Sequence, residues 1–151
     1  LLLARQFGME YVDEDGKKKT PYIIHRTSLG CFERTLAYLI EKYAGALPLW
    51  MAPEQVRILT ITDRTQPYAA ELKSRLDAMG VRCAVDARNE KIGYKIREAQ
   101  MEKLPYMLVL GDKEAESGEV AVRGRDGSTT NMSFDAFAAR IAAEIATKAR
   151  I

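Results

Sequence analysis

The fold of this chain is decided by the stretch DARNEKIGYKIREAQMEKLPYMLVLGDKEAESGEVAVRGR, residues 86–125. It opens on a polar corner at 86–90, and apolar residues then recur at helical spacing, which predicts a helix over 91–103. The run 106–110 is almost wholly apolar and stops at a glycine, as expected of a central strand covered on both faces. A loop and a further strand that ends near Arg123 complete the stretch. The pattern predicts a helix-covered sheet with polar residues at its strand ends.

Strands and helices alternate on both sides of this stretch. Five strands are predicted, at 56–62, 81–85, 106–110, 120–123 and 129–132. One helix begins near Pro67, a tolerated first-turn proline, and the last begins after Ser133, which can cap it. Strands that alternate with helices imply parallel pairs, whereas the turn at Asp126–Gly127 joins an antiparallel hairpin. The predicted class is α/β with a mixed five-stranded sheet, in the order β-α-β-α-β-β-β-α.

The first third of the chain has a different character. A charged turn around Asp15–Gly16 predicts a short hairpin, and helical spacing from Leu29 onward predicts a helix. The segment LPLWMAP, residues 47–53, contains two prolines, which break both helix and strand pairing, so we expect an ordered linker there. The expected parts are therefore 1–53 and 54–151. An opening on three leucines without Met indicates a chain cut from a longer one.

Composition limits the class of protein. A chain of 151 residues can bury one good core, and 47% hydrophobic with 29% charged residues is typical of a soluble globular protein. No apolar run reaches the roughly 20 residues of a membrane span. The net charge is only +2, so RNA binding can be argued solely from the local distribution of Lys and Arg. The two cysteines form no CxxC pair, which favours free thiols in a reducing cytoplasm.

Catalytic signatures are missing from the sequence. Neither of the glycine-rich phosphate loops, GxGxxG and GxxxxGKS/T, occurs, and no GxSxG supports a nucleophilic serine. A single histidine cannot assemble a Cys/His metal cluster from local residues. This inventory disfavours an enzyme that is complete within these residues.

Basic residues gather where the polar corner meets the predicted helix. Arg88, Lys91 and Lys95 are spaced by three and four residues, so we expect them to share one helical face near a helix N-terminus, which favours anions. One interpretation is an ordinary solvated face, balanced by Glu90, Glu98 and Glu102. The other is an RNA-binding surface, because strand ends and the loops after them form binding sites in α/β sheets. Asn and Arg there could read unstacked bases, and Lys could hold phosphate.

Three segments together resemble a known family. RNEKIGYKIRE (88–98), PYMLVLGDKE (105–114) and GEVAVRGR (118–125) resemble the C-terminal anticodon-binding domain of bacterial threonyl-tRNA synthetase. The stretch IHRTSLGCFERTLAYLIEKYAGALPLWMAPEQV (24–56) is similar to the end of that family's catalytic domain, including class II motif 3. The resemblance implies a three-layer class IIa anticodon-binding domain, preceded within 1–53 by a fragment of the antiparallel catalytic domain.

The resemblance also implies roles for individual residues. The positions that match anticodon-reading residues are Asn89, Glu114 and Arg123. From their location, we expect supporting RNA contacts from Lys91, Lys95 and Arg97. His25 matches one of three protein ligands to a zinc ion that grips threonine, and Arg34 matches the motif 3 arginine that contacts ATP. Cys31 stands where the family commonly has serine, which leaves fine active-site contacts open.

What the resemblance implies for the whole protein is a threonine-tRNA ligase. Such an enzyme attaches threonine to its tRNA with ATP and Mg²⁺, is cytoplasmic, and forms a homodimer through its catalytic core. Motifs 1 and 2, the remaining zinc ligands and the editing domain are absent from this sequence, so we expect these residues alone to be inactive and to bind neither Zn²⁺ nor ATP. The alternative is a free-standing accessory module of the same fold that binds RNA or protein without aminoacylation. A preference for a threonine anticodon would distinguish the two.

Overall fold

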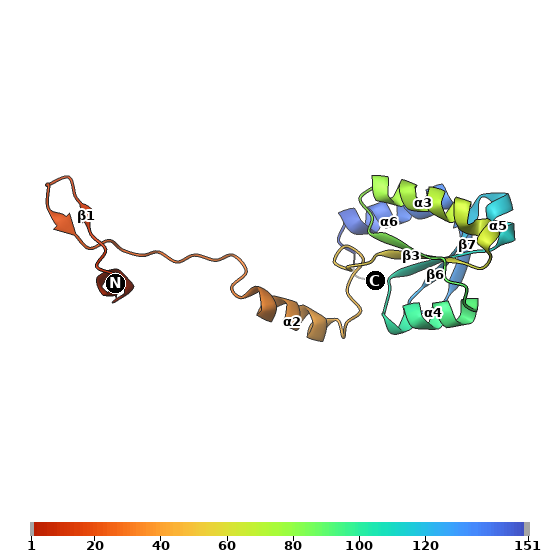
Figure 1. Cartoon of the computed structure of the whole chain (residues 1–151), viewed down its shortest axis with the longest axis horizontal. Coiled ribbons are helices and arrows are strands. Elements are labelled where there is room, and N and C mark those ends of the chain that lie inside the picture. The colour runs from red at the N-terminus through yellow and green to blue at the C-terminus, as the bar shows by residue number, and fades with distance from the viewer. Residues whose placement is uncertain (1, 150–151) are drawn as a thin grey trace. The chain divides into compact units, whose positions relative to one another are not determined.

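The computed structural model describes residues 2–149 (Figure 1). The chain falls into two compact units, which divide between Thr35 and Leu36. The first contains a short helix, α1 (Leu2–Gln6), and two strands, β1 (Tyr11–Val12) and β2 (Lys18–Lys19). These strands pair antiparallel around a turn, as the sequence predicts. The predicted helix after Leu29 is α2 (Phe32–Lys42), which crosses the division.

The second unit is built on one mixed sheet. Its strands are β3 (Val56–Thr60), β4 (Cys83–Asp86), β5 (Tyr106–Leu110), β6 (Glu119–Gly124) and β7 (Thr129–Ser133). The order across the sheet is β4-β3-β5-β6-β7, with β3 parallel to β4 and β5 and the remaining pairs antiparallel. The predicted five-stranded mixed sheet is confirmed, and β5 is its central strand.

Helices cover both faces of this sheet. They are the 3-10 turn η1 (Asp63–Thr65) and the α-helices α3 (Gln66–Ala78), α4 (Ile92–Met101), α5 (Asp112–Ser117) and α6 (Phe134–Ala146). α3 and α6 lie on one face and α4 on the other (Figure 1). The alternation of strand residues divides the core accordingly: Ile58 packs with α3 and α6, whereas its neighbour Leu59 packs with Ala99 of α4. As predicted, the hydroxyl of Ser133 accepts a hydrogen bond from the first turn of α6.

One helix is not predicted from the sequence. The segment after β5, expected to be a loop, forms α5. Its six residues, DKEAES, carry no apolar repeat from which a helix could be predicted. A helix this short can form after a strand without an apolar face that packs on the core. Gly118, at φ +71°, ends it in the left-handed conformation that glycine adopts readily. The predicted helix over 91–103 is also shorter, because Lys103 has φ +58° and cannot continue it.

The proline-containing linker lies within the second unit and contributes Leu49 to its core. Leu49 is fully buried, and its carbonyl oxygen accepts a hydrogen bond of 2.9 Å from the buried Gln55 amide. Arg82 donates to the carbonyl oxygen of Ala52 at 2.9 Å through Nε. The backbone of 44–53 is therefore held by side chains of the folded domain. The domain boundary expected after residue 53 stays a prediction. Among residues 2–149, no helix is long and apolar enough to span a membrane.

Candidate nucleic-acid interface

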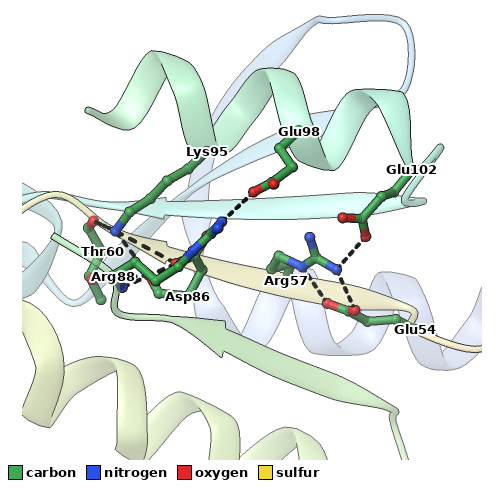
Figure 2. Close-up of polar contacts among 8 residues, drawn as sticks. All are labelled: Glu54, Arg57, Thr60, Asp86, Arg88, Lys95, Glu98 and Glu102. Carbon is green, nitrogen blue, oxygen red and sulfur yellow. Dashed lines mark hydrogen bonds and ion pairs between the residues drawn. The ribbon is translucent and has the colours of Figure 1, made fainter. Parts of the chain in front are cut away.

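The polar corner after β4 is anchored by Asp86, which is 8% exposed. Its carboxylate accepts hydrogen bonds from the backbone N–H of Arg88 at 3.1 Å and from the same residue's Nε and Nη2 at 2.9 and 2.6 Å. These bonds hold the pKa of the Asp86 carboxyl below its ordinary value, because they stabilise the charged form. Arg88 also donates to Glu98 of α4 (Figure 2). The corner is thereby tied to both its strand and its helix.

The structure corrects the role predicted for Lys95. The sequence predicts an exposed RNA contact, but the side chain is only 1% exposed. Its Nζ atom donates to the carbonyl oxygens of Thr60 at 2.9 Å and of Asp86 at 3.1 Å, and lies 3.9 Å from Asp86 Oδ1 (Figure 2). Lys95 is on the sheet-facing side of α4, four residues before the buried Ala99. It therefore cannot contact RNA in this conformation.

The predicted basic helical face is also wrong, because α4 begins only at Ile92. Arg88 lies in the corner before the helix, and Lys91 is its N-cap residue with extended backbone. Arg88, Lys91 and Lys95 thus belong to three different environments. Spacing alone could not show this, because the helical rule applies only from the first helical residue onward.

A hollow of about 360 Å³ lies beside the corner, between β4 and α4. Its cations are all paired with acids (Figure 2). Arg57 Nη2 lies 2.7 Å from Glu54 Oε2 and 2.6 Å from Glu102 Oε2. Arg88 is shared in the same way between Asp86 and Glu98. Since two acids surround each cation, the hollow offers no unbalanced positive charge to a phosphate.

Three polar side chains of the corner and α4 lie outside the lining of this hollow. Asn89 and Lys91 are exposed in the corner, and Arg97 is exposed on α4. None of these three side chains forms a hydrogen bond or ion pair with another of the residues 2–149. They are therefore available to a ligand, as is the exposed Glu90 beside them.

Glu114 lies in α5, the helix that the sequence does not predict. It is half-buried, and its Oε2 accepts a hydrogen bond of 2.9 Å from the backbone N–H of Gly111. A Cβ atom at Gly111 would lie 2.9 Å from that oxygen, so a larger residue there would displace the end of the Glu114 side chain. The Thr62 hydroxyl donates to Asp112 at 3.0 Å and joins α5 to the end of β3. Glu114 is thus held at the carboxyl end of the central strand.

Arg123 projects from β6 on the face that bears α4. Its pairing partners are Met107 of β5, which packs with α4, and Thr129 of β7. Nη1 donates to the Thr129 hydroxyl at 3.2 Å, while Nε is buried and has no partner among residues 2–149. Gly127 lies next to the guanidinium, and its φ of +81° is a backbone conformation that favours glycine. Because Nε is buried, an RNA acceptor could reach only the outer nitrogens of this half-buried side chain.

The structure brings only some predicted residues to one edge. Asn89 and Glu114 follow the carboxyl ends of the parallel strands β4 and β5. Arg123 instead pairs with Met107, near the other end of β5, so strand ends alone do not collect all three. Asn131 shares the face of Arg123 and is exposed, and sequence reasoning did not single it out. Because Met132 packs on the core that contains α3 and α6, strand alternation would have placed its neighbour Asn131 on the opposite face.

The residues predicted for chemistry lie in the first unit. His25 is exposed in a segment without regular structure, and Arg34 is exposed on α2. Residues 2–149 contain no group of three or more His, Cys, Asp or Glu side chains that could hold a metal ion. These residues therefore do not by themselves form the zinc site that the resemblance implies.

Comparisons with known proteins agree on one family. Residues 55–144 match a family model described as an anticodon binding domain. A threonine–tRNA ligase of Clostridium perfringens is 56% identical over 147 residues, 97% of this chain and 23% of that protein. The corresponding ligase of Halorhodospira halophila is 51% identical over 142 residues, 93% of this chain and 22% of that protein. This chain thus spans less than a quarter of the length of these curated relatives.

A solved structure is also similar. The crystal structure of the RNA binding domain of threonyl-tRNA synthetase from Cryptosporidium parvum has a TM-score of 0.74 and 33% sequence identity. The match covers 93% of this chain and 36% of that one.

Proposed function

Since this chain belongs to the anticodon-binding domain family, we propose that its second unit recognises the anticodon of a threonine tRNA. The observation that carries the proposal is the 56% identity to a threonine–tRNA ligase over 147 residues, 97% of this chain. The resemblance to the C-terminal portion of bacterial threonyl-tRNA synthetases, stated from the sequence, is confirmed by this match.

Three side chains are proposed to read bases, each through different chemistry. The Asn89 amide offers a donor and an acceptor in one plane, which can pair with a base edge. Arg123 offers donors only and suits the acceptors of guanine or of uracil. Glu114 is proposed to accept a hydrogen bond from a base through Oε1, which forms no hydrogen bond within residues 2–149. Its Oε2 atom keeps the hydrogen bond from the backbone N–H of Gly111. The exposure of Asn89 supports its role.

Lys91 and Arg97 are proposed to contact phosphates rather than bases. Both are exposed cations near Asn89 in sequence, and neither has an acidic partner among residues 2–149. Phosphate contacts fix the position of a nucleic acid but carry no sequence information. Their loss should weaken binding to every RNA by a similar factor.

For the whole protein we propose a threonine–tRNA ligase that uses ATP and acts as a cytoplasmic homodimer. Residues 1–53 are then the end of its catalytic domain with the linker, and 54–151 the anticodon-binding domain. In that protein His25 would supply one zinc ligand and Arg34 an ATP contact. We derive no catalytic step from them, because the described residues do not complete either site.

The test is binding of the 151-residue chain to an RNA stem-loop that carries the threonine anticodon GGU. Affinity should fall steeply with salt, as expected when phosphates are neutralised. Asn89→Ala and Arg123→Ala should each weaken binding by on the order of 1–3 kcal/mol. Lys73→Ala serves as the control, because Lys73 lies on α3, on the other face of the sheet. Equal affinity of all four proteins at one salt concentration would contradict the proposed site.

A further inference from the structure

We propose that Lys95 is a positioning residue for base recognition: it holds the corner that carries Asn89 in the conformation that presents the amide to RNA. The inference rests on the proposed function, and it replaces the direct RNA contact that the sequence predicts for this lysine. Lys95 is buried, and the inferred role requires no contact between its side chain and RNA.

The ammonium group of Lys95 joins the ends of two neighbouring strands. It donates to the carbonyl oxygen of Thr60, the last residue of β3, at 2.9 Å and to that of Asp86, the last residue of β4, at 3.1 Å. The Thr60 hydroxyl donates to the same Asp86 carbonyl at 3.2 Å. An isolated buried charge is costly, so a lysine is retained at this depth only where acceptors surround it. Here those acceptors are the backbone from which the corner starts.

The contact also closes the corner as a short loop. Residues 87–91 connect β4 to α4, and Asn89 lies at their centre. At the far end, the carbonyl oxygen of Lys91 accepts from the backbone N–H of Tyr94 at 2.8 Å, which begins the helix. Lys95, in the next part of that helix, reaches back to the carbonyl at the near end (Figure 2). Both ends of the connection are thereby fixed relative to each other, which restricts the conformations open to Asn89.

Arg88 supplies a second tie, but of a different kind. It binds the Asp86 carboxylate and Glu98 and is half-exposed, so water can replace its contacts. The contacts of Lys95 are buried and cannot be replaced in this way. A lysine also suits the site better than an arginine, because a compact ammonium can direct its donors to separate acceptors, whereas a guanidinium is a planar fork.

A purely structural lysine would behave differently from a positioning lysine. Loss of a structural contact lowers stability and weakens binding to all RNAs by the same factor. Loss of a positioning contact removes discrimination at the one base that Asn89 reads. This loss of discrimination occurs only while Asn89 is present. Once Asn89 has been replaced, no amide remains to be positioned, so the Lys95 substitution has no further effect at that base.

The experiment is a double-mutant cycle on the 151-residue chain, with Lys95→Met, Asn89→Ala and the double variant. Dissociation constants are measured for the GGU stem-loop and for stem-loops in which each anticodon base is changed singly. Asn89→Ala identifies the base that Asn89 reads. Lys95→Met should lower discrimination at that base by about tenfold, the value of a lost base contact, and leave the other positions unchanged. In the Asn89→Ala background it should have no further effect on discrimination.

Two further variants keep the test decisive. Leu76→Val shortens a buried side chain on the other face of the sheet, and it should lower stability without changing discrimination. If Lys95→Met does not fold, Thr60→Val replaces it, because it removes one bond to the same carbonyl and keeps the shape. A uniform loss of affinity, or additive effects of the two substitutions, would overturn the inference. A wild-type chain that does not discriminate among anticodons would instead overturn the proposed function.

Discussion

The Nη2 atom of Arg125 lies 2.6 Å from the carbonyl oxygen of Leu47, far away in the sequence. Nε of the same guanidinium donates to the carbonyl oxygen of Lys103 at 2.8 Å. Arg125 therefore fastens the linker to the turn after α4. Burial lowers its pKa from the ordinary value, yet arginine remains charged at any physiological pH. Arg125, which directly follows β6, thus fixes the position of the linker at Leu47.

Replacement of Arg125 by methionine should loosen the linker locally. The carbonyl oxygens of 46 and 47 lose their charged donor, so amide exchange of 44–52 should accelerate by an amount equivalent to about 1–3 kcal/mol. Hydrogen exchange measured by mass spectrometry would resolve this segment. Arg64→Ala, an exposed arginine in η1, is the control and should leave these amides unchanged. Unchanged protection in Arg125→Met would contradict the fastening role.

Replacement of Phe137 in the core should strongly lower the stability of the protein. This side chain is fully buried, and its ring packs edge-on against Tyr106, with centroids 5.7 Å apart. Phe137→Ala should lower the free energy of unfolding by about 3–5 kcal/mol, because it leaves a cavity between α6 and the sheet. Urea denaturation measures the loss. Met101→Ala, at a position that is 74% exposed, should change stability by less than about 1 kcal/mol.

Much of the fold could be predicted from the sequence, because the inner strands of the second unit are largely apolar and its main helices have apolar repeats. The polar strand β7 was predicted from the hairpin turn before it. The site could be predicted only in part. The spacing of Lys95 from Arg88 and Lys91 predicts a shared basic helical face. Because α4 begins only at Ile92, the three residues do not share a face, and Lys95 lies on the side toward the sheet. Glu114 was recognised only through the family resemblance, since its polar helix carries no periodic signal. The role of the Asp86 carboxylate depends on the turn of the backbone between 86 and 88, which residue type alone does not specify.

The Asp86 carboxyl should make stability depend on acid pH. Its pKa is lowered in the folded state, chiefly by hydrogen bonds from Arg88, with the Lys95 ammonium 3.9 Å away. A depressed pKa contributes stability that is present above the unfolded value of about 3.9 and is lost as pH falls through the folded value. An NMR titration of the Asp86 carboxyl carbon should therefore have its midpoint below about 3.9. Arg88→Met should move the midpoint upward, and a wild-type midpoint at the ordinary value would contradict the assigned contacts.

The two thiols should differ strongly in reactivity. Burial raises the pKa of the Cys83 thiol to about 12, so almost none of it is thiolate at neutral pH. Cys31 is exposed on the surface of its unit. Iodoacetamide should therefore alkylate Cys31 much faster than Cys83, as peptide mass spectrometry can follow. In denaturant the two rates should converge, and equal rates in the native protein would show that β4 opens readily.

Arg123 and Lys91 should weaken RNA binding in distinguishable ways. A guanidinium reads a base edge through a planar fork of donors, which an ammonium cannot reproduce, so Arg123→Lys should reduce discrimination although the charge is kept. Lys91→Ala removes an exposed cation, so it should weaken all stem-loops alike and reduce the slope of log affinity against log salt by about 1. Titrations at several salt concentrations, with the GGU stem-loop and its single-base variants, separate the two effects. If Arg123→Lys retains full discrimination at an unchanged salt slope, the side chain acts only as a positive charge near phosphate, and base reading must then rest on Asn89 and Glu114.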